Sequence, residues 1–307
     1  MGNMREPSEL YRLRRPADEM PRGLPLVAAI TGFTDAGGAV QQVTEYLLDA
    51  LDAEVVVEFD GDALLDYRAR RPILFFDETR FTEYRRPELA IRLARDELGA
   101  PFLLMTGYEP DFRWEGFTDA VVALVEQWEV ASTTWINAIP MPVPHTRPIG
   151  STVSGNREDL TDAHSIWRPQ TQVPGNAMHL LEYKLQEAGQ PVAGFVLLIP
   201  HYLGDTEYPA AAVAALESIT AATGLLLPTD RLREEGREFL AKVDDQVEGN
   251  SELQRLVGTL EDRHDSYMED NALRSPLTGD DGEVPSADSI AAELEKFLAH
   301  RRRADDD

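Results

Sequence analysis

A glycine-rich turn at residues 32–38 is the sharpest candidate for binding chemistry in this sequence. It reads Gly-Phe-Thr-Asp-Ala-Gly-Gly and lies between an apolar run at 26–30 and a helical apolar repeat that starts at Val40. Such a turn presents backbone N–H groups and a helix N-terminus to an anion, so Asp35, Gly37 and Gly38 are candidate ligand-binding residues. The spacing matches neither a P-loop nor a dinucleotide fingerprint. A purely structural strand-to-helix turn is the alternative.

A proline-rich segment at 140–148 carries a histidine and an arginine. Its four prolines favour an extended path, and His145 and Arg147, two residues apart, would then point to the same side. Arginine binds carboxylate or phosphate groups as a two-pronged donor, so both residues are candidate anion ligands. The alternative is a structural ion pair at Arg147 and a histidine whose hydrogen bonds are satisfied within the turn.

Two further candidates directly follow apolar runs. Glu109 lies two residues after Gly107, behind the run at 101–106, and His201 follows the run at 192–199. Each also has a purely structural alternative: Glu109 as part of a capped turn, and His201 as a lone structural histidine.

All these candidates follow the carboxyl ends of predicted strands. In an open parallel sheet those ends line one edge, where ligands usually bind. The candidates can therefore meet in one cleft, as a site for acid–base chemistry or for binding an anion. They are Asp35, Gly37, Gly38, Glu109, His145, Arg147 and His201. The pattern assigns a catalytic role to none of them.

Several kinds of chemistry are excluded by what the sequence lacks. Cysteine is absent, which removes thiolate zinc sites, iron–sulfur clusters, disulfides and cysteine nucleophiles. The six histidines show no metal-binding spacing of the H-E-x-x-H kind, and no G-x-S-x-G elbow occurs. We expect neither a metal nor a cofactor.

The elements that must position these residues alternate along the chain. Short apolar runs predict buried strands at 26–30, 55–59, 101–106, 131–136 and 192–199. Apolar residues at helical spacing predict helices at 40–51, 87–98, 114–128, 176–188 and 210–222. This alternation is typical of an α/β fold with a mostly parallel sheet between two layers of helices.

The chain divides into four predicted segments. An N-terminal arm at 1–22 precedes the core at 23–228, and a helical appendage at 229–270 could cover the cleft as a lid. Residues 271–307 combine a linker, a terminal amphipathic helix and an acidic tail. Within the core, residues 62–78 resemble an inserted β-hairpin, with strands at 64–70 and 73–77. We expect this locally basic hairpin to be a self-association surface, because open strand edges favour pairing; a solvated hairpin is the alternative.

The overall charge restricts the partners. The 307 residues hold 29 basic and 55 acidic side chains, for a net charge of −26. A chain with this much negative charge repels the phosphate groups of nucleic acids and anionic lipids. We therefore expect it to bind neither nucleic acid nor membranes. With its short apolar runs, the sequence predicts a soluble, cytoplasmic protein.

Four of the motifs together resemble those of a known family. They are Thr31-Gly-Phe-Thr-Asp-Ala-Gly37, Gly107-Tyr-Glu-Pro110, Val143-Pro-His-Thr-Arg-Pro148 and Ile199-Pro-His-Tyr202. Over residues 24–270 the sequence resembles the bacterial, chiefly actinobacterial, branch of the second proteasome assembly chaperone family. The resemblance implies an α/β/α sandwich related to purine nucleoside phosphorylases, with an added hairpin and C-terminal helices. It also implies a homo-oligomer, with a trimer favoured.

The resemblance leaves two functions open. Eukaryotic members help α-type proteasome subunits assemble, which implies an assembly or interaction protein without established catalysis and with a proteasome-related or other protein partner. Their tails carry a hydrophobic–Tyr–any motif, which is missing from the Arg303-Ala-Asp-Asp-Asp307 end of this sequence. The alternative is a binder or enzyme for a nucleoside- or phosphate-like molecule, a small anionic ligand held in the cleft.

Overall fold

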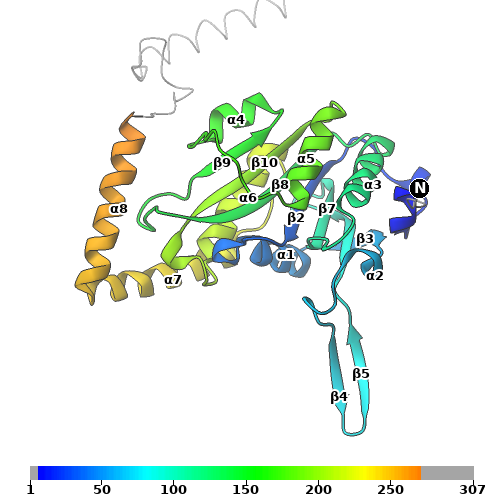
Figure 1. The fold of residues 1–307 in the computed structure, drawn as a ribbon, viewed down its shortest axis with the longest axis horizontal. Helices are drawn as coiled ribbons and strands as arrows, with labels where there is room; N and C mark the ends of the chain where they lie inside the picture. Colours follow the sequence, from blue (N-terminus) through cyan, green and yellow to red (C-terminus); the bar gives the residue numbers. More distant parts are fainter. Residues whose placement is uncertain (1–5, 271–307) are drawn as a thin grey trace, which may run out of the picture. The chain divides into compact units, whose positions relative to one another are not determined.

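The computed structural model describes residues 6–270 and shows an eight-stranded sheet with helices on both faces (Figure 1). The strand order is β1-β3-β6-β7-β2-β8-β10-β9, and β4 pairs with β5 in a separate hairpin. The strands are β1 (Tyr11–Leu13), β2 (Pro25–Thr31), β3 (Ala53–Phe59), β4 (Ile73–Asp77), β5 (Arg80–Arg85), β6 (Leu89–Arg95), β7 (Pro101–Tyr108), β8 (Ser132–Met141), β9 (Ser151–Gly155) and β10 (Val192–Pro200). The helices are α1 (Ala39–Ala50), α2 (Gly61–Leu64), α3 (Trp114–Gln127), α4 (Glu158–His164), α5 (Ala177–Glu187), α6 (Pro209–Thr223), α7 (Asp230–Glu248) and α8 (Ser251–Asp270). The predicted α/β fold is confirmed.

One hydrophobic cluster on each face of the sheet holds the layers together. On one face α1 and α6 bury side chains such as Leu47 and Leu216. On the other face α3 and α5 bury side chains such as Phe117 and Leu181. Because successive side chains of a strand point to opposite faces, β2 supplies residues to both clusters. The long apolar runs of the central strands follow from this burial on two sides.

The sheet is mixed, so the prediction of a mostly parallel sheet is wrong outside its centre. Strands β7, β2, β8 and β10 are parallel neighbours. The pairs β1–β3, β3–β6, β6–β7 and β10–β9 are antiparallel. A short turn joins β6 to β7, and strands joined so tightly can pair only in the antiparallel direction. The four parallel strands nevertheless place their carboxyl ends at one edge, as expected.

The predicted helix at 87–98 is wrong, because this segment contains strand β6. Its Leu, Ala and Arg residues are good helix formers. However, β6 lies between β3 and β7, where residues on both faces are buried, including Ile91 and Ala94. Pairing on both sides outweighs the local helix preference.

The inserted hairpin is present, but it lies further along the chain than predicted. The expected strand at 73–77 is β4, whereas 64–70 is not a strand; α2 ends at Leu64 and turns follow. The partner of β4 is β5, and Asp77 pairs with Arg80 across the two-residue turn Glu78-Thr79. The chain therefore reverses at this tight turn rather than at residues 71–72, which separate the two predicted strands.

Two compact units are distinguished along the chain, Met1–Asp262 and Arg263–Asp307. The predicted terminal helix and acidic tail at 271–307 lie outside the described residues, and the predicted domain boundaries stay predictions. None of the helices within residues 6–270 combines the length and the apolar character needed to cross a membrane.

Candidate functional site

Asp35 in the glycine-rich turn caps helix α1. Its carboxylate oxygens accept hydrogen bonds from the backbone N–H groups of Val40, at 2.8 Å, and Gln41, at 2.9 Å. Burial raises the pKa of the Asp35 carboxyl, and these N–H donors partly offset that effect. The free N–H groups expected to attract an anion are thus bound by the chain's own carboxylate at this helix end.

The two glycines of this turn adopt the left-handed backbone conformation, with φ of 70° at Gly37 and 57° at Gly38. The Gly37 N–H donates to the Gly204 carbonyl at 2.8 Å, and the Gly37 carbonyl accepts from the Tyr208 N–H at 2.8 Å. These bonds join the turn to the segment that directly precedes α6. The binding role of Asp35, Gly37 and Gly38 stays a prediction, and the geometry gives each of them a structural task.

Glu109 is buried and joins two loops. Its Oε1 accepts from the Ala177 N–H at 2.7 Å, at the first residue of α5, and its Oε2 accepts from the Phe33 N–H at 3.2 Å. A methyl group at Gly32 would lie 2.5 Å from Oε2, so only glycine fits beside this carboxylate. The same side chain lines a small hollow with Gly32, Phe33 and Asn176.

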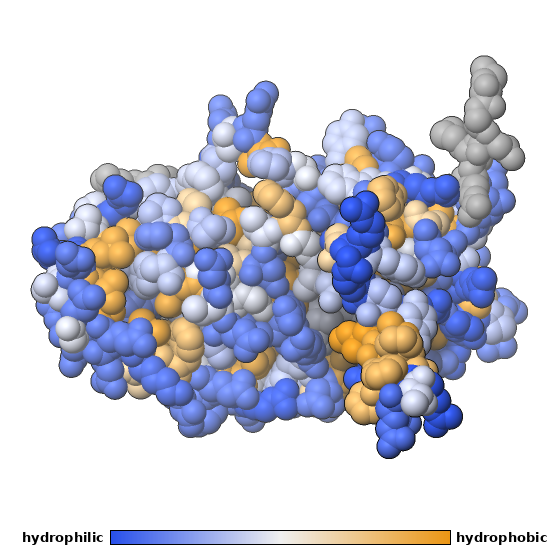
Figure 2. Space-filling model, turned by 60° about the horizontal axis from the view of Figure 1, so that its bottom comes forward, coloured by the Kyte–Doolittle hydropathy of each residue, from blue (hydrophilic) through white to orange (hydrophobic). Residues whose placement is uncertain are grey.

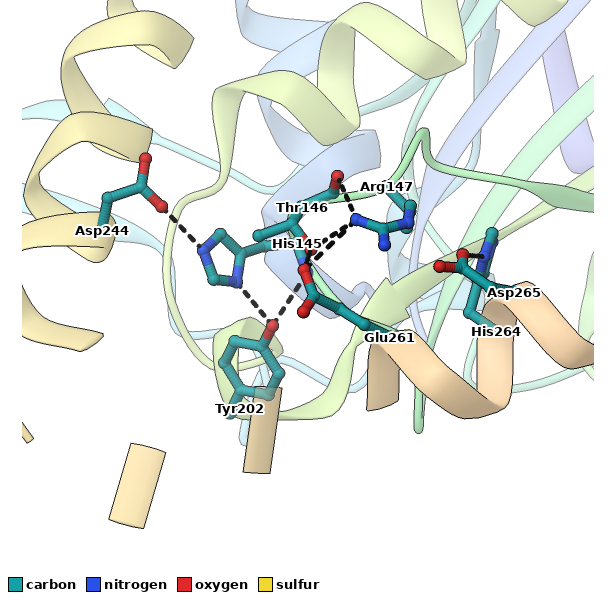
Figure 3. A network of polar contacts seen from close by, with 8 residues as sticks. All are labelled: His145, Thr146, Arg147, Tyr202, Asp244, Glu261, His264 and Asp265. Atoms are coloured by element: carbon teal, nitrogen blue, oxygen red, sulfur yellow. Dashed lines mark hydrogen bonds and ion pairs between the residues drawn. The ribbon is translucent and has the colours of Figure 1, made fainter. Parts of the chain in front are cut away.

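His145 is buried at the centre of a network of polar contacts that Figure 3 shows. The Tyr202 oxygen accepts the backbone N–H of His145 at 2.8 Å and lies 2.7 Å from its Nδ1. On the other side of the ring, Nε2 lies 3.1 Å from Oδ1 of Asp244 on α7. If the Tyr202 hydroxyl donates to Nδ1, the neutral imidazole carries its hydrogen on Nε2 and donates it to Asp244. Burial raises the pKa of the Tyr202 hydroxyl, which keeps this donor protonated.

Arg147 and its neighbour Thr146 contact the same acid on helix α8. The Thr146 hydroxyl donates to Oε1 of Glu261 at 2.5 Å, and Nη1 of Arg147 lies 3.2 Å from that oxygen (Figure 3). Together with the bond from His145 to Asp244, these contacts attach the proline-rich segment to α7 and to the first part of α8. The predicted structural alternative for Arg147, an ion pair, is therefore present.

A groove of about 440 Å³ lies beside this network. Its walls come from α6, from α7 and from the segment at 145–149, and both His145 and Arg147 line it. Glu109 lines the separate hollow described above, and His201 is exposed, with its ring 5.4 Å from that of Tyr202. The candidates thus share the sheet edge, but the structure brings only His145 and Arg147 together in this groove.

Within residues 6–270, no group of three or more His, Asp or Glu side chains has the arrangement of a metal site. The ionisable side chains that line the groove are three arginines, the ion-paired Glu217, Tyr208, and His145, whose ring nitrogens are both engaged. Such an arrangement can bind an anion. Proton transfer by His145 would first require one of its two ring hydrogen bonds to open.

Comparison with known proteins identifies the family. The sequence model described as the PAC2 family matches residues 29–247, well over half of the chain. The chain belongs to the PAC2 family. This confirms the family that the four motifs indicate, because PAC2 denotes the second proteasome assembly chaperone. No curated protein matches the chain.

Solved structures similar to this PAC2-family chain include two actinobacterial proteins of unknown function. The one from Corynebacterium glutamicum is 37% identical, with a TM-score of 0.80, and the match covers 85% of this chain and 98% of that protein. Rv2714 from Mycobacterium tuberculosis is 41% identical, with a TM-score of 0.78 and coverage of 88% and 94%. Rv2125 from the same organism, a proteasome-assembly chaperone homologue, is 24% identical, with a TM-score of 0.68 and coverage of 76% and 100%, which shows a shared fold.

Four residues of the network described above were not among the predicted site residues, namely Thr146, Tyr202, Asp244 and Glu261. Thr146 stands between two predicted residues, His145 and Arg147. Tyr202 lies in the motif that contains His201, so its aromatic hydroxyl beside a strand end was an available signal. The two acids belong to the strongly acidic helices after residue 229, where nothing in the spacing distinguishes them from their neighbours.

We expect Tyr202→Phe to lower the free energy of unfolding of this PAC2-family protein by about 1–3 kcal/mol, because the buried His145 N–H loses its acceptor. Urea unfolding followed by circular dichroism measures this, and hydrogen exchange should accelerate at the His145 amide. Tyr183→Phe, at an exposed tyrosine of α5, is the matched control and should change neither measurement. Equal stability of the two variants would contradict a structural role for the Tyr202 hydroxyl.

Proposed function

We propose that this PAC2-family protein is a homo-oligomeric assembly or interaction protein whose β4–β5 hairpin joins one copy to the next. The supporting observation is the apolar surface of the hairpin. Six large side chains on it are exposed, from 46% for Leu74 to 69% for Phe81. They are Ile73, Leu74, Phe75, Phe76, Phe81 and Tyr84.

The hairpin extends away from the main sheet (Figure 1), and Figure 2 shows a concentrated hydrophobic patch where it comes forward. Among the described residues, β4 and β5 pair only with each other. A two-stranded hairpin is marginally stable alone in water, and apolar patches of this kind commonly mark interaction sites. Binding to a partner would therefore stabilise the hairpin by burying its apolar side chains.

Both faces of β4 are apolar. Ile73 and Phe75 point to one face of the strand and Leu74 and Phe76 to the other, and all four are exposed. An uninterrupted apolar run is typical of a strand buried on both faces, whereas a strand with one wet face alternates. A partner that covers both sides of the hairpin fits this pattern.

Charge favours a second copy as that partner. Residues 66–86 contain six arginines and four acidic residues, although the whole chain has a net charge of −26. A locally basic hairpin is attracted to the acidic surface of an identical molecule. We propose a trimer, on the strength of the family resemblance.

The proposal also includes a proteasome-related protein as a partner. Rv2125 is a proteasome-assembly chaperone homologue of the same fold, which supports a proteasome-related protein as a further partner. The cytoplasmic location expected from the sequence stays a prediction, as does the likeness to purine nucleoside phosphorylases.

The test compares native masses. The wild type should show a multiple of the 34.2 kDa protomer, with three protomers expected, in native mass spectrometry and light scattering. Phe75→Asp with Phe81→Asp should give the protomer mass, because two charges would be buried in the interface. Leu98→Asp, at an exposed leucine outside the hairpin, is the control and should keep the wild-type mass. A monomeric wild type at micromolar concentration, or an oligomeric double variant, would contradict the proposal.

A second candidate function is supported by the groove that His145 and Arg147 line. Its volume falls in the range of small-molecule sites, which favours the binder of a small anionic ligand that the sequence suggests. No reaction is proposed for it.

A further inference from the structure

Helix α6 has an apolar outer face. The side that packs on the sheet carries residues such as Leu216 and Ile219, which are buried. The opposite side carries Ala210, Val213 and Ala214 before the first acid, Glu217. A helix that is apolar all round is normally covered on every side.

Helix α7 covers only part of this outer face. Its Gly236 lies against α6, where an added methyl group would be 3.5 Å from the Ala210 nitrogen. Beside this contact, Leu232 and Leu240 of α7 and Ile149 of the opposite wall enclose the groove of about 440 Å³. Pockets of roughly 300–1,000 Å³ with apolar walls are typical of small-molecule sites.

The charged groups that line the groove are mostly cations. Arg233 and Arg237 stand one turn apart on α7, and Arg147 belongs to the other wall, against a single lining acid, Glu217. Arg233 pairs with Glu217 at 2.6 Å, and Arg237 pairs with Glu234, which lies outside the lining. Exposed ion pairs of this kind are weak, so an incoming anion can replace these acids. Arg147 pairs with Glu261, so each lining arginine has an acidic partner, and of the three acids only Glu217 lines the groove.

The lining is poorly suited to a nucleoside. A base and a ribose need several hydrogen-bond donors and acceptors, whereas the floor of the groove is made of Ala, Val, Leu and Gly side chains. Both ring nitrogens of His145 are already engaged, with Tyr202 and Asp244. The other polar side chains of the lining are three arginines, the ion-paired acid Glu217 and Tyr208, so the ligand should be apolar in its body and anionic at one end.

We infer that this groove binds an amphipathic anion, with an apolar chain or ring on the floor formed by α6 and a carboxylate or phosphate held by Arg233 and Arg237. The inference rests on the second candidate function and names its ligand class. It is independent of the hairpin.

Isothermal titration calorimetry on the full chain tests it, with octyl phosphate as the probe. Octyl phosphate should bind one site per protomer. Inorganic phosphate, which lacks the chain, octanol, which lacks the anion, and adenosine monophosphate should each bind at least tenfold more weakly. Arg233→Gln with Arg237→Gln should weaken octyl phosphate at least tenfold. Ala214→Phe, which fills the floor, should do the same.

A matched control distinguishes loss of the two groove arginines from a general loss of positive charge on α7. Arg231→Gln with Lys242→Gln removes the same charge from α7 at positions outside the groove lining, and should leave affinity unchanged. Circular dichroism of each variant confirms that it is folded. The hairpin variant Phe75→Asp with Phe81→Asp should bind octyl phosphate as the wild type does.

Three outcomes overturn the inference. Tighter binding of adenosine monophosphate than of octyl phosphate would keep a ligand site but reject the amphipathic class. Equal loss of affinity in the groove variant and its control would place the probe elsewhere. Absence of binding by every probe at 1 mM would reject both the inference and the second candidate function, while the oligomer measurement would still decide the first.

Discussion

Gly107→Ala should lower the free energy of unfolding by at least about 3 kcal/mol, or prevent folding altogether. Gly107 lies in β7 with a φ of 131°, a conformation that other residues rarely adopt. A methyl group there would lie 2.1 Å from the Glu88 carbonyl oxygen and 2.7 Å from the Leu89 Cα. Both are backbone atoms, one in Leu89, which begins β6 and pairs with Gly107, and one in the residue before it. Turning a side chain therefore cannot relieve the clash.

The matched control is Gly99→Ala in the turn between β6 and β7. Gly99 also has a positive φ, 81°, but a methyl group there would meet nothing within 4 Å. The control should therefore cost only the backbone strain of about 1–2 kcal/mol. Urea unfolding of both variants, followed by circular dichroism, gives the two values. Similar losses at the two positions would show that β6 moves away from Gly107 at little cost.

The regular elements of the core could be predicted because their signals are local. Buried strands such as β2 and β10 appear as apolar runs, and helices such as α1 and α3 appear as apolar residues at three- and four-residue spacing. The position of the candidates followed from the same pattern, since strands linked by helical crossovers share their direction. Asp35, Glu109, His145 and His201 therefore lie at one sheet edge, as expected.

The errors lie where long-range pairing decides the structure. The segment at 87–98 has helix-forming residues and becomes β6 only because β3 and β7 lie on either side of it. Likewise, the sequence pattern places the hairpin turn at residues 71–72, between the segments 64–70 and 73–77. The tight turn at Glu78-Thr79 instead pairs β4 with the polar β5. The local sequence pattern predicts neither strand β6 nor the pairing of β4 with β5.

The candidate site shows the same limit. His145 meets Asp244, which is 99 positions away, and Thr146 meets Glu261, which is 115 positions away. The acids come from helices whose exposed faces carry many similar carboxylates, so only the packing of α7 and α8 selects these two. The histidine and arginine could be predicted, because prolines fix their backbone, but their partners could not.

Glu109→Ala should lower the free energy of unfolding by about 2–4 kcal/mol, because the N–H groups of Ala177 and Phe33 both lose their acceptor. The first of these N–H groups starts helix α5, so the carboxylate also offsets the positive end of the helix dipole. Glu109→Gln keeps one carbonyl oxygen and should lose about half as much. The cavity left beside Gly32 adds to the cost of the alanine variant.

Glu115→Ala is the control, since Glu115 is exposed and pairs with Lys184 at 2.6 Å on the surface, where such pairs contribute about 0–1 kcal/mol. Thermal and urea unfolding rank the three variants. The octyl phosphate titration then separates the two roles considered for Glu109. If Glu109 only joins the two loops, its variants should be less stable but should bind octyl phosphate with unchanged affinity when folded, because Glu109 lines a different hollow from Arg147. Unchanged stability with altered affinity would instead make Glu109 part of the binding site, and the sheet edge would then act as the single cleft that the sequence predicts.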